Sequence, residues 1–401
     1  MKRLVAIIEW NLDGHRLPWF SYYCRACLDL GCQVVALCPE PEKAREYVSS
    51  FDEKYCDDAR IRFAKLRVSF SPRFVPGRIR RKIRPYLFAS HVRDRLKEAE
   101  RDFGRKTDFF FFSCLLEHEE WYARKLVDTL HIPWSGLNLH ARVNPSRNGS
   151  NGTHVFSMQS LFESRDLVSV GVIDEEMDLP IAQALNKPVV VMPEISDERY
   201  QKNHPFEERF RRFANGSKLV LVPGHLRPNK GIINLAKVAM DPAMSKVAFA
   251  FVGEVPWGLF SAKEREFFEY AITHAPSSIF HLNAIPDGPE YNAAIRSCDV
   301  LFAAYHDFSH SSNTLSKAAI FQKPLIVSDG YLMAKRVRAY RMGEVIPQNN
   351  SEATIQAIER LTQDYPGWEA RVKPRWREYE ERHSYKALIE AFAKLLSGAS
   401  K

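Results

Sequence analysis

The chain has 401 residues, of which 45% are hydrophobic, so its length and composition predict two domains that each bury a core. Its 57 Lys and Arg against 49 Asp and Glu give a net charge of +8, which favours acidic ligands such as phosphates, nucleic acid or anionic lipid without choosing among them. A charged fraction of 26% argues against general disorder, and no apolar run is long enough to span a bilayer.

The cysteines and the first residues of the chain bear on its compartment. Seven cysteines without regular spacing do not form a disulfide framework and are typical of a reducing compartment. Cys24 and Cys27 form a C-x-x-C pair, but they lie in an apolar helical stripe, which favours core packing over redox or metal chemistry. The first apolar run ends at Glu9, which is too short for an export segment. We therefore expect a cytoplasmic protein, with peripheral contact to the inner face of a membrane left open.

Short apolar runs alternate with amphipathic segments through the first half. Residues 4–8 predict a buried strand, 16–30 a helix that Gly31 ends, and 33–37 a second strand, which together make a βαβ unit. Further strands are predicted at 61–66, 108–113, 134–140, 167–174 and 188–193. Their near-continuous apolar character indicates a parallel sheet covered on both faces.

A composition change separates this series from a second one. Residues 194–217 are charged and carry no strand pattern, so they predict a linker and one helix. Strands are then predicted at 218–223, 247–252, 279–285, 300–305 and 324–328, and helices at 232–240, 263–274, 291–298, 314–322 and from 351 onward. We therefore predict an α/β fold with two Rossmann-like, doubly wound domains.

Ligands of such sheets bind beyond the carboxyl ends of the strands. If the two domains face a central cleft, the loops after both sets of strands contribute to one site. These loops cover residues 11–15, 117–120, 140–144, 224–231, 253–258 and 306–313.

Four ordered pieces of the second half carry a family resemblance. They are KLVLVPGHLRPNKGIINLAKVA, VAFAFVGE, IFHLNAIPDGPEYNAAIRSCDVLFAAY and SNTLSKAAIFQKPLIVSDG. In this order and spacing they resemble the GT-B glycosyltransferases, specifically the retaining family 4. The first half adds Asp13-Gly14-His15 after the first strand. The resemblance implies an acceptor-side domain at 1–195, a linker at 196–216, a nucleotide-sugar-binding domain at 217–383, and a final helix at 384–401 that packs back on the first domain.

The family pattern is altered at three positions. Family members have Gly-Arg and then Lys-Gly after the strand at 218–223, and both cations bind the donor diphosphate. Here His225 replaces the arginine, Arg227 stands two residues on, and Lys230-Gly231 is intact. Two family glutamates, which contact the donor sugar and the nucleotide ribose, are replaced by Ser309 and Lys317.

The resemblance implies a role for each matched position. Lys230, His225 and Arg227 would bind the diphosphate, although a solvated lysine and a loop histidine without ligand remain alternatives. Ser309, Ser311, Ser312 and Asn313 would form an anion cradle of hydroxyl and N–H donors, with helix capping as the alternative. Lys317 would face the diphosphate or nucleotide, or be solvated.

Two residues of the first half complete the predicted site. Gly14 would approach the donor phosphates closely, with a simple turn glycine as the alternative. His140 would lie beside the transferred sugar as the catalytic residue, with a core or surface histidine as the alternative. The acidic run 117–120 is more typical of a solvated helix start than of an acceptor site.

A basic stretch from Arg78 to Arg84 precedes a long amphipathic pattern. It is suited to an anionic membrane surface or a lipid-phosphate acceptor, and a solvated helix face is the alternative. No nucleic-acid module with interleaved aromatics is present, so no nucleic-acid partner is expected.

We expect a glycosyltransferase that moves a sugar from a nucleoside diphosphate sugar to a glycan, lipid-linked or small-molecule acceptor with retention, without a cofactor or metal. Three alternatives remain. The chain could be a non-catalytic GT-B protein that binds a glycan or partner, a nucleotide-sugar epimerase-like enzyme, or a membrane-surface adaptor.

Overall fold

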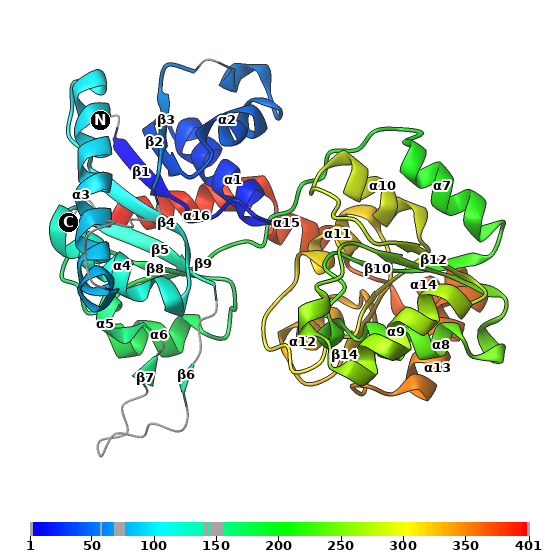
Figure 1. Ribbon diagram of the computed structural model, residues 1–401. Helices are drawn as coiled ribbons and strands as arrows, with labels where there is room; N and C mark the ends of the chain where they lie inside the picture. The colour runs from blue at the N-terminus through cyan, green and yellow to red at the C-terminus, as the bar shows by residue number, and fades with distance from the viewer. Residues whose placement is uncertain are drawn as a thin grey trace. The chain divides into compact units, whose positions relative to one another are not determined.

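The structure is a computed structural model that describes residues 3–56, 58–67, 77–139, 143–144, 155–156 and 158–398. For residues 77–81, 143–144, 155–156 and 159 it describes the backbone only. The chain forms two compact units (Figure 1). The first contains Met1–Ile195 together with Ser384–Lys401, and the second contains Ser196–His383.

The first unit is built on a parallel sheet. Its strands are β1 (Leu4–Ile8), β2 (Gln33–Cys38), β3 (Ile61–Lys65), β4 (Phe109–Leu115), β5 (Trp134–Asn138), β8 (Val170–Val172) and β9 (Val189–Val191). They pair in the order β3-β2-β1-β4-β5-β8-β9, and every pair is parallel. A separate antiparallel pair joins β6 (Val143–Asn144) and β7 (Val155–Phe156).

Helices cover both faces of this sheet (Figure 1). They are α1 (Arg16–Asp29), α2 (Pro41–Ser49), α3 (Gly77–Phe103), α4 (Glu120–Leu130), α5 (Gln159–Phe162), α6 (Asp178–Leu185) and α16 (Tyr385–Ser397). Because side chains alternate along a strand, Val5 and Ile7 pack toward α1 and α16, whereas Leu4, Ala6 and Ile8 pack toward α3 and α4.

Helix α16 completes the core of the first unit from the far end of the chain. The ring of Phe392 lies 5.3 Å from that of Tyr23 on α1 and 4.7 Å from that of Phe111 on β4. The Tyr385 hydroxyl donates to Asp29 Oδ2 at 2.8 Å. One face of the first sheet is therefore buried by residues that follow the whole second unit in sequence.

The second unit has a six-stranded parallel sheet. Its strands are β10 (Lys218–Pro223), β11 (Val247–Val252), β12 (Ser278–His281), β13 (Val300–Ala303), β14 (Leu325–Ser328) and β15 (Gly343–Ile346). They pair in the order β12-β11-β10-β13-β14-β15. The carboxyl ends of β10 and β13, which are neighbours, thus lie at the same edge.

The helices of the second unit form two layers. Helices α7 (Pro205–Ala214), α10 (Pro289–Ser297), α11 (Asn313–Phe321), α12 (Leu332–Tyr340) and α15 (Trp376–Arg382) cover one face. Helices α8 (Ile232–Ala239), α9 (Ala262–His274), α13 (Ser351–Gln363) and α14 (Tyr365–Val372) cover the other.

Several predicted strands are shorter than expected, and three strands were not predicted: the short pair β6 and β7, and β15. The strand predicted at 279–285 ends at His281, because β12 is an edge strand that pairs only with the last part of β11. Strand β15 was not predicted, since its sequence has no apolar run. A Cβ on its first residue, Gly343, would lie 1.9 Å from Leu325 O, so only glycine permits this approach.

Candidate functional site

The loop after β10 holds the intact Lys-Gly pair. Lys230 ends a short 3₁₀ turn, and its Nζ donates to Pro223 O at 3.2 Å, which places the ammonium at the carboxyl end of β10. Gly231 has φ +73 and begins helix α8. A Cβ on Gly231 would lie 2.4 Å from Ala304 O, so glycine is required for the turn that carries Lys230.

The other two predicted cations of this loop are exposed. The His225 side chain is 47% exposed, and its Nε2 lies 3.6 Å from Glu254 Oε2, a contact that becomes an ion pair only when the histidine is protonated. Arg227 is exposed and precedes the 3₁₀ turn. The loop therefore presents cationic side chains at the edge of the sheet, as an anion site requires.

A buried tyrosine connects this loop to helix α11. The Lys230 Nζ lies 5.3 Å from the ring centroid of Tyr305, which follows β13. Burial raises the pKa of the Tyr305 phenol, and the Lys230 ammonium lowers it. Hydrogen bonds with Ser312 and Thr314 lower it further, so the phenol pKa lies below its ordinary value.

Some of the polar side chains before α11 already form hydrogen bonds within the protein. Ser312 is the N-cap of α11 and accepts from the Thr314 amide at 3.3 Å, so the capping alternative holds at this position. Ser311 Oγ accepts from the buried Arg336 at 2.9 Å. The buried Oγ of Ser309 and Oδ1 of Asn313 have no hydrogen-bond partner within the described part of the chain.

Lys317 differs from both alternatives that the sequence suggested. Its side chain is 0% exposed, so it is not solvated. Its Nζ donates to Asp287 Oδ1 at 2.6 Å, to Asn292 Oδ1 at 2.6 Å and to Asp197 O at 2.5 Å. An ammonium has three donors, and all three have internal acceptors here, so the side chain points into the unit and not toward a ligand.

In the first unit, the turn that carries Gly14 follows β1. Gly14 is exposed and has φ +59, a conformation that favours glycine, and a Cβ there would meet no atom within 4 Å. At position 14, glycine is therefore favoured by the backbone conformation and not by close packing within the protein. Contact between Gly14 and donor phosphates stays a prediction.

A buried charge cluster, which the sequence did not reveal, supports this turn. Glu9 Oε1 accepts from the amides of Trp10 and Asn11 and from Arg16 Nη1 at 2.8 Å. Glu9 Oε2 accepts from the Ser113 hydroxyl at 2.5 Å. Burial raises the pKa of Glu9 to about 7, although Arg16 lowers it.

Glu119 completes this cluster. It is buried and accepts from Arg16 Nη1 at 3.3 Å, so the solvated interpretation of the acidic run 117–120 is wrong for this residue. Burial also raises the pKa of Glu119. Glu9 and Arg16 adjoin the turn at its two ends, and Ser113 and Glu119 join the cluster from β4 and the loop after it.

Two predictions fall outside the described residues. His140 is one of them, so its catalytic role stays a prediction. In the basic stretch, Pro76 and the side chains of 77–81 also lie outside, while α3 begins at Gly77, Lys82 is exposed and Arg84 is half-buried. No described helix has the length and apolar character needed to cross a bilayer.

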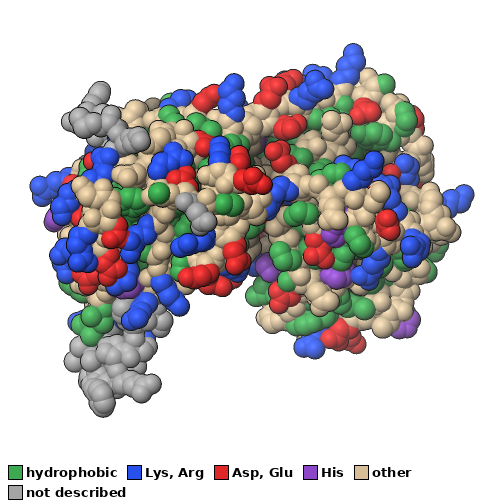
Figure 2. Space-filling model, turned by 90° about the horizontal axis from the view of Figure 1, so that it is seen from above, with side chains coloured by type: hydrophobic (Ala, Val, Ile, Leu, Met, Phe, Trp, Pro, Cys, Tyr) green, Lys and Arg blue, Asp and Glu red, His purple; other side chains and the backbone are tan. Residues whose placement is uncertain are grey.

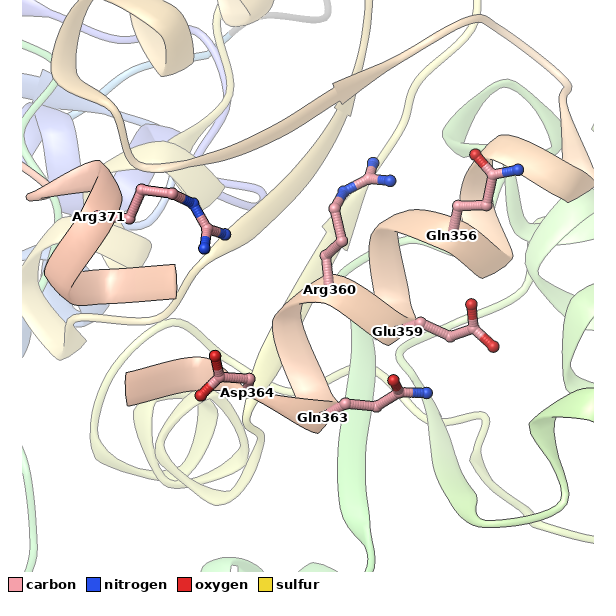
Figure 3. A pocket seen from close by; sticks show the side chains of 6 residues that line it. All are labelled: Gln356, Glu359, Arg360, Gln363, Asp364 and Arg371. Carbon is pink, nitrogen blue, oxygen red and sulfur yellow. The ribbon is translucent and has the colours of Figure 1, made fainter. Parts of the chain in front are cut away.

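The described residues hold no metal-binding cluster, and a surface pocket of the second unit lies away from the candidate site. Among the described side chains, no three His, Cys, Asp or Glu residues are arranged to hold a metal ion. Figure 3 shows a surface pocket on α13 and α14 that is lined by polar residues: Gln356, Glu359, Arg360, Gln363, Asp364 and Arg371. None of these residues belongs to the loops at the carboxyl edge, so this pocket is separate from the candidate site.

A family of known proteins matches most of the second unit. Residues 204–383 match the family described as "Glycosyl transferases group 1". No curated protein sequence matches the chain.

Solved structures show the same fold over almost the whole chain. Anabaena Alr3699/HepE in complex with UDP-glucose is 12% identical, with a TM-score of 0.68 and coverage of 99% of this chain and 100% of that one. Sucrose-phosphate synthase from Thermosynechococcus elongatus is 15% identical, with a TM-score of 0.66 and coverage of 99% and 98%. An E. coli structure described as trehalose-6-phosphate bound with UDP-2-fluoro glucose is 13% identical, with a TM-score of 0.67 and coverage of 100% and 99%. The fold is therefore GT-B, as the sequence predicted.

Proposed function

We propose that this chain, which has the GT-B fold and matches the group 1 glycosyl transferases over residues 204–383, transfers a sugar from a nucleoside diphosphate sugar to an acceptor. The observation that carries the proposal is the arrangement of Lys230, Gly231 and Tyr305 at the carboxyl ends of β10 and β13. This arrangement lies inside the matched segment and at the edge where doubly wound sheets bind ligands.

The proposed roles follow from charge and position. Lys230, with His225 and Arg227, would bind the diphosphate and stabilise the negative charge that develops on it as the sugar leaves. A cation fixed by a rigid turn needs no rearrangement at that moment, and Gly231 provides such a turn. These groups would replace a metal ion, so we propose that the reaction needs none.

The polar run at 309–313 would supply neutral contacts. Ser309, Ser311, Ser312 and Asn313 lie at the start of α11, where the helix dipole favours an anion. We propose that they contact the donor phosphates or sugar, and that His140 lies beside the reacting carbon. Retention of configuration is part of the proposal because the sequence resembles a retaining family.

The partners and compartment are proposed on more general grounds. Figure 2 shows Lys and Arg side chains interspersed with Asp and Glu over the visible face. Because the basic side chains are mixed with acidic ones there, no nucleic-acid partner is proposed. All seven cysteines are free, which suits a reducing cytoplasm. The acceptor would be a glycan, a lipid-linked sugar or a small molecule.

The donor is identified by a thermal-shift series with UDP-, GDP-, ADP- and dTDP-sugars, since a ligand that binds the native state raises its stability. Lys230→Ala should weaken binding of the stabilising donor by roughly tenfold or more, because it removes a charge-assisted hydrogen bond. Isothermal titration calorimetry measures the affinity.

Lys218→Ala is the matched control for this test. Lys218 begins the same strand, β10, at its opposite end, and pairs with Asp299 at 2.9 Å. It should bind the donor as the parent does. Equal affinities for Lys230→Ala and the parent would remove Lys230 from the site.

The alternatives predict different results. A non-catalytic GT-B protein, which the replacement of both glutamates by Ser309 and Lys317 would favour, neither transfers nor hydrolyses a donor sugar. A membrane-surface adaptor binds anionic liposomes through the stretch from Arg78 to Arg84, and reversal of charge at Arg80, Arg81 and Lys82 would reduce that binding.

A further inference from the structure

The buried ion pair of Lys317 and Asp287 lies at the same edge as the proposed diphosphate site. Asp287 is in the loop between β12 and α10, and Lys317 is in the second turn of α11. The lysine is fully buried, while the Asp287 side chain is 12% exposed. Of the two charged groups, only the carboxylate reaches the surface of the unit.

Asp287 has acceptor capacity that its protein partners do not use. Oδ1 accepts from Lys317, and Oδ2 accepts from Asn313 Nδ2 at a long 3.4 Å. A carboxylate has about four lone-pair sites, so sites remain for further donors. Beside it, the buried Oδ1 of Asn313 has no donor within the described part of the chain.

Tyr291 joins this acceptor pair to the cationic loop. Its ring centroid lies 5.6 Å from Lys317 Nζ. At the other end, a Cβ placed on Gly224 would lie 3.5 Å from the Tyr291 hydroxyl and 2.9 Å from Lys230 Nζ. The acceptors and the cation therefore belong to one continuous site, with Tyr291 between them.

We infer that Asp287, positioned by Lys317, binds hydroxyl groups of the nucleotide sugar, with Asn313 Oδ1 as a second acceptor. The inference deepens the proposed function and rests on it. A ligand that carries phosphates and neighbouring hydroxyls matches a site with a cation at one end and acceptors at the other. Because Lys317 neutralises Asp287, the carboxylate can stand near a diphosphate without strong repulsion.

This assignment explains why a lysine is tolerated at position 317. A lysine cannot accept hydrogen bonds from hydroxyls. It can, however, hold a carboxylate from a neighbouring loop in place. Lys317 is therefore a positioning residue, and the ligand contact is made by Asp287.

The test measures the affinity of the parent and of Asp287→Asn for UDP, GDP and ADP, each in its ribose and 2′-deoxyribose form, and for UDP-glucose. We expect Asp287→Asn to lose on the order of tenfold in affinity for the probe that carries the hydroxyls bound by Asp287. If ribose supplies the hydroxyls, the parent prefers the ribose form and the variant does not. If the sugar supplies them, the variant instead loses the advantage of UDP-glucose over UDP.

Asp299→Asn is the matched control, because Asp299 also pairs with a lysine of this unit, Lys218, but at the opposite edge of the sheet. It should retain both the affinity and the preference of the parent. Asp287→Asn leaves Lys317 without its counter-ion, so the double variant Asp287→Asn with Lys317→Gln removes both charges together. It should show the same loss of hydroxyl preference.

The outcomes separate the inference from the proposed function. Binding of a nucleotide by the parent, with unchanged affinity and preference in a folded Asp287→Asn or double variant, would overturn the role of Asp287 alone. Failure of the parent to bind any of these probes would overturn the proposed function, and the inference with it.

Discussion

At the carboxyl edge of the first sheet, two buried carboxylates, Glu9 and Glu119, share one guanidinium, that of Arg16. At the corresponding edge of the second sheet, Arg227 is exposed, and the exposed His225 lies beside the exposed Glu254. The buried Lys317 is matched there by Asp287. The two buried clusters thus differ in charge balance: two carboxylates share one guanidinium at the first edge, whereas one carboxylate is matched by one lysine at the second. The proposed diphosphate site lies at the second edge, beside Lys230, while the cluster at the first edge holds the turn that carries Gly14.

The largest effect is expected at the second edge, when the charge of the buried Lys317 is reversed. Lys317→Glu places a second buried carboxylate against Asp287 and the Asp197 carbonyl. Loss of one partner of a buried ion pair costs about 3–5 kcal/mol of stability, and we expect a decrease of at least that order. Chemical denaturation of the two proteins measures the difference.

Lys218→Glu provides the comparison for this prediction, since the Lys218–Asp299 pair is largely exposed. Exposed pairs contribute about 1 kcal/mol or less. Similar losses in the two variants would show that the burial of Lys317 has no energetic consequence.

The first edge is tested through the pH dependence of stability. The pKa of Glu9 is raised from 4.5 to about 7, so between these values the folded chain binds a proton that the unfolded chain releases. The stabilising effect of this proton is complete below about pH 4.5 and is lost as the pH rises through 7. Glu9→Gln should remove up to about 3 kcal/mol of that pH dependence.

The free energy of unfolding of Glu9→Gln and of the parent, measured from pH 5 to 8, checks this prediction. The difference between them should change across the window and level off above it. Glu290→Gln, at an exposed position of the second unit, should leave the profile unchanged. A parallel profile for Glu9→Gln would mean that Glu9 is ionised throughout.

The smallest expected effect concerns the turn that the first cluster supports. Gly14→Ala should cost about 1 kcal/mol, because a φ of +59 is unfavourable for alanine although the space for its Cβ is open. Gly258→Ala, in an exposed 3₁₀ turn with open space and no positive φ, should be close to neutral. A loss of donor affinity in Gly14→Ala beyond this change in stability would indicate that Gly14 contacts the donor.

The sequence predicted the parts of the fold that depend on local pattern. The apolar runs at β1, β10 and β11 identify the central strands, and the Lys230-Gly231 pair identifies the loop after β10. Edge strands were misjudged because their length depends on the neighbouring strand. Strand β15 was missed because Gly343 is selected by contact with β14 and not by strand propensity.

The charged residues of the site show a different limit. From the sequence, Lys317 is seen to lie in an apolar helix that follows a polar loop. Its partner Asp287 cannot be found in this way, because it lies in the loop after another strand. In the same way, Glu9 marks only the end of an apolar run, whereas the fold brings Ser113 and Arg16 to it. Burial of a charge is decided by partners that are distant in sequence, and local pattern does not contain that information.

The position of α16 has a consequence for synthesis of the chain. Residues from Ser384 onward complete the first unit, yet they are translated after the entire second unit. During translation, the second unit can finish folding while the face of α1 and β4 that receives Phe392 is still open to solvent. The first unit therefore begins to emerge from the ribosome first and reaches its final packing last, so chaperones have the longest access to its unfinished apolar face.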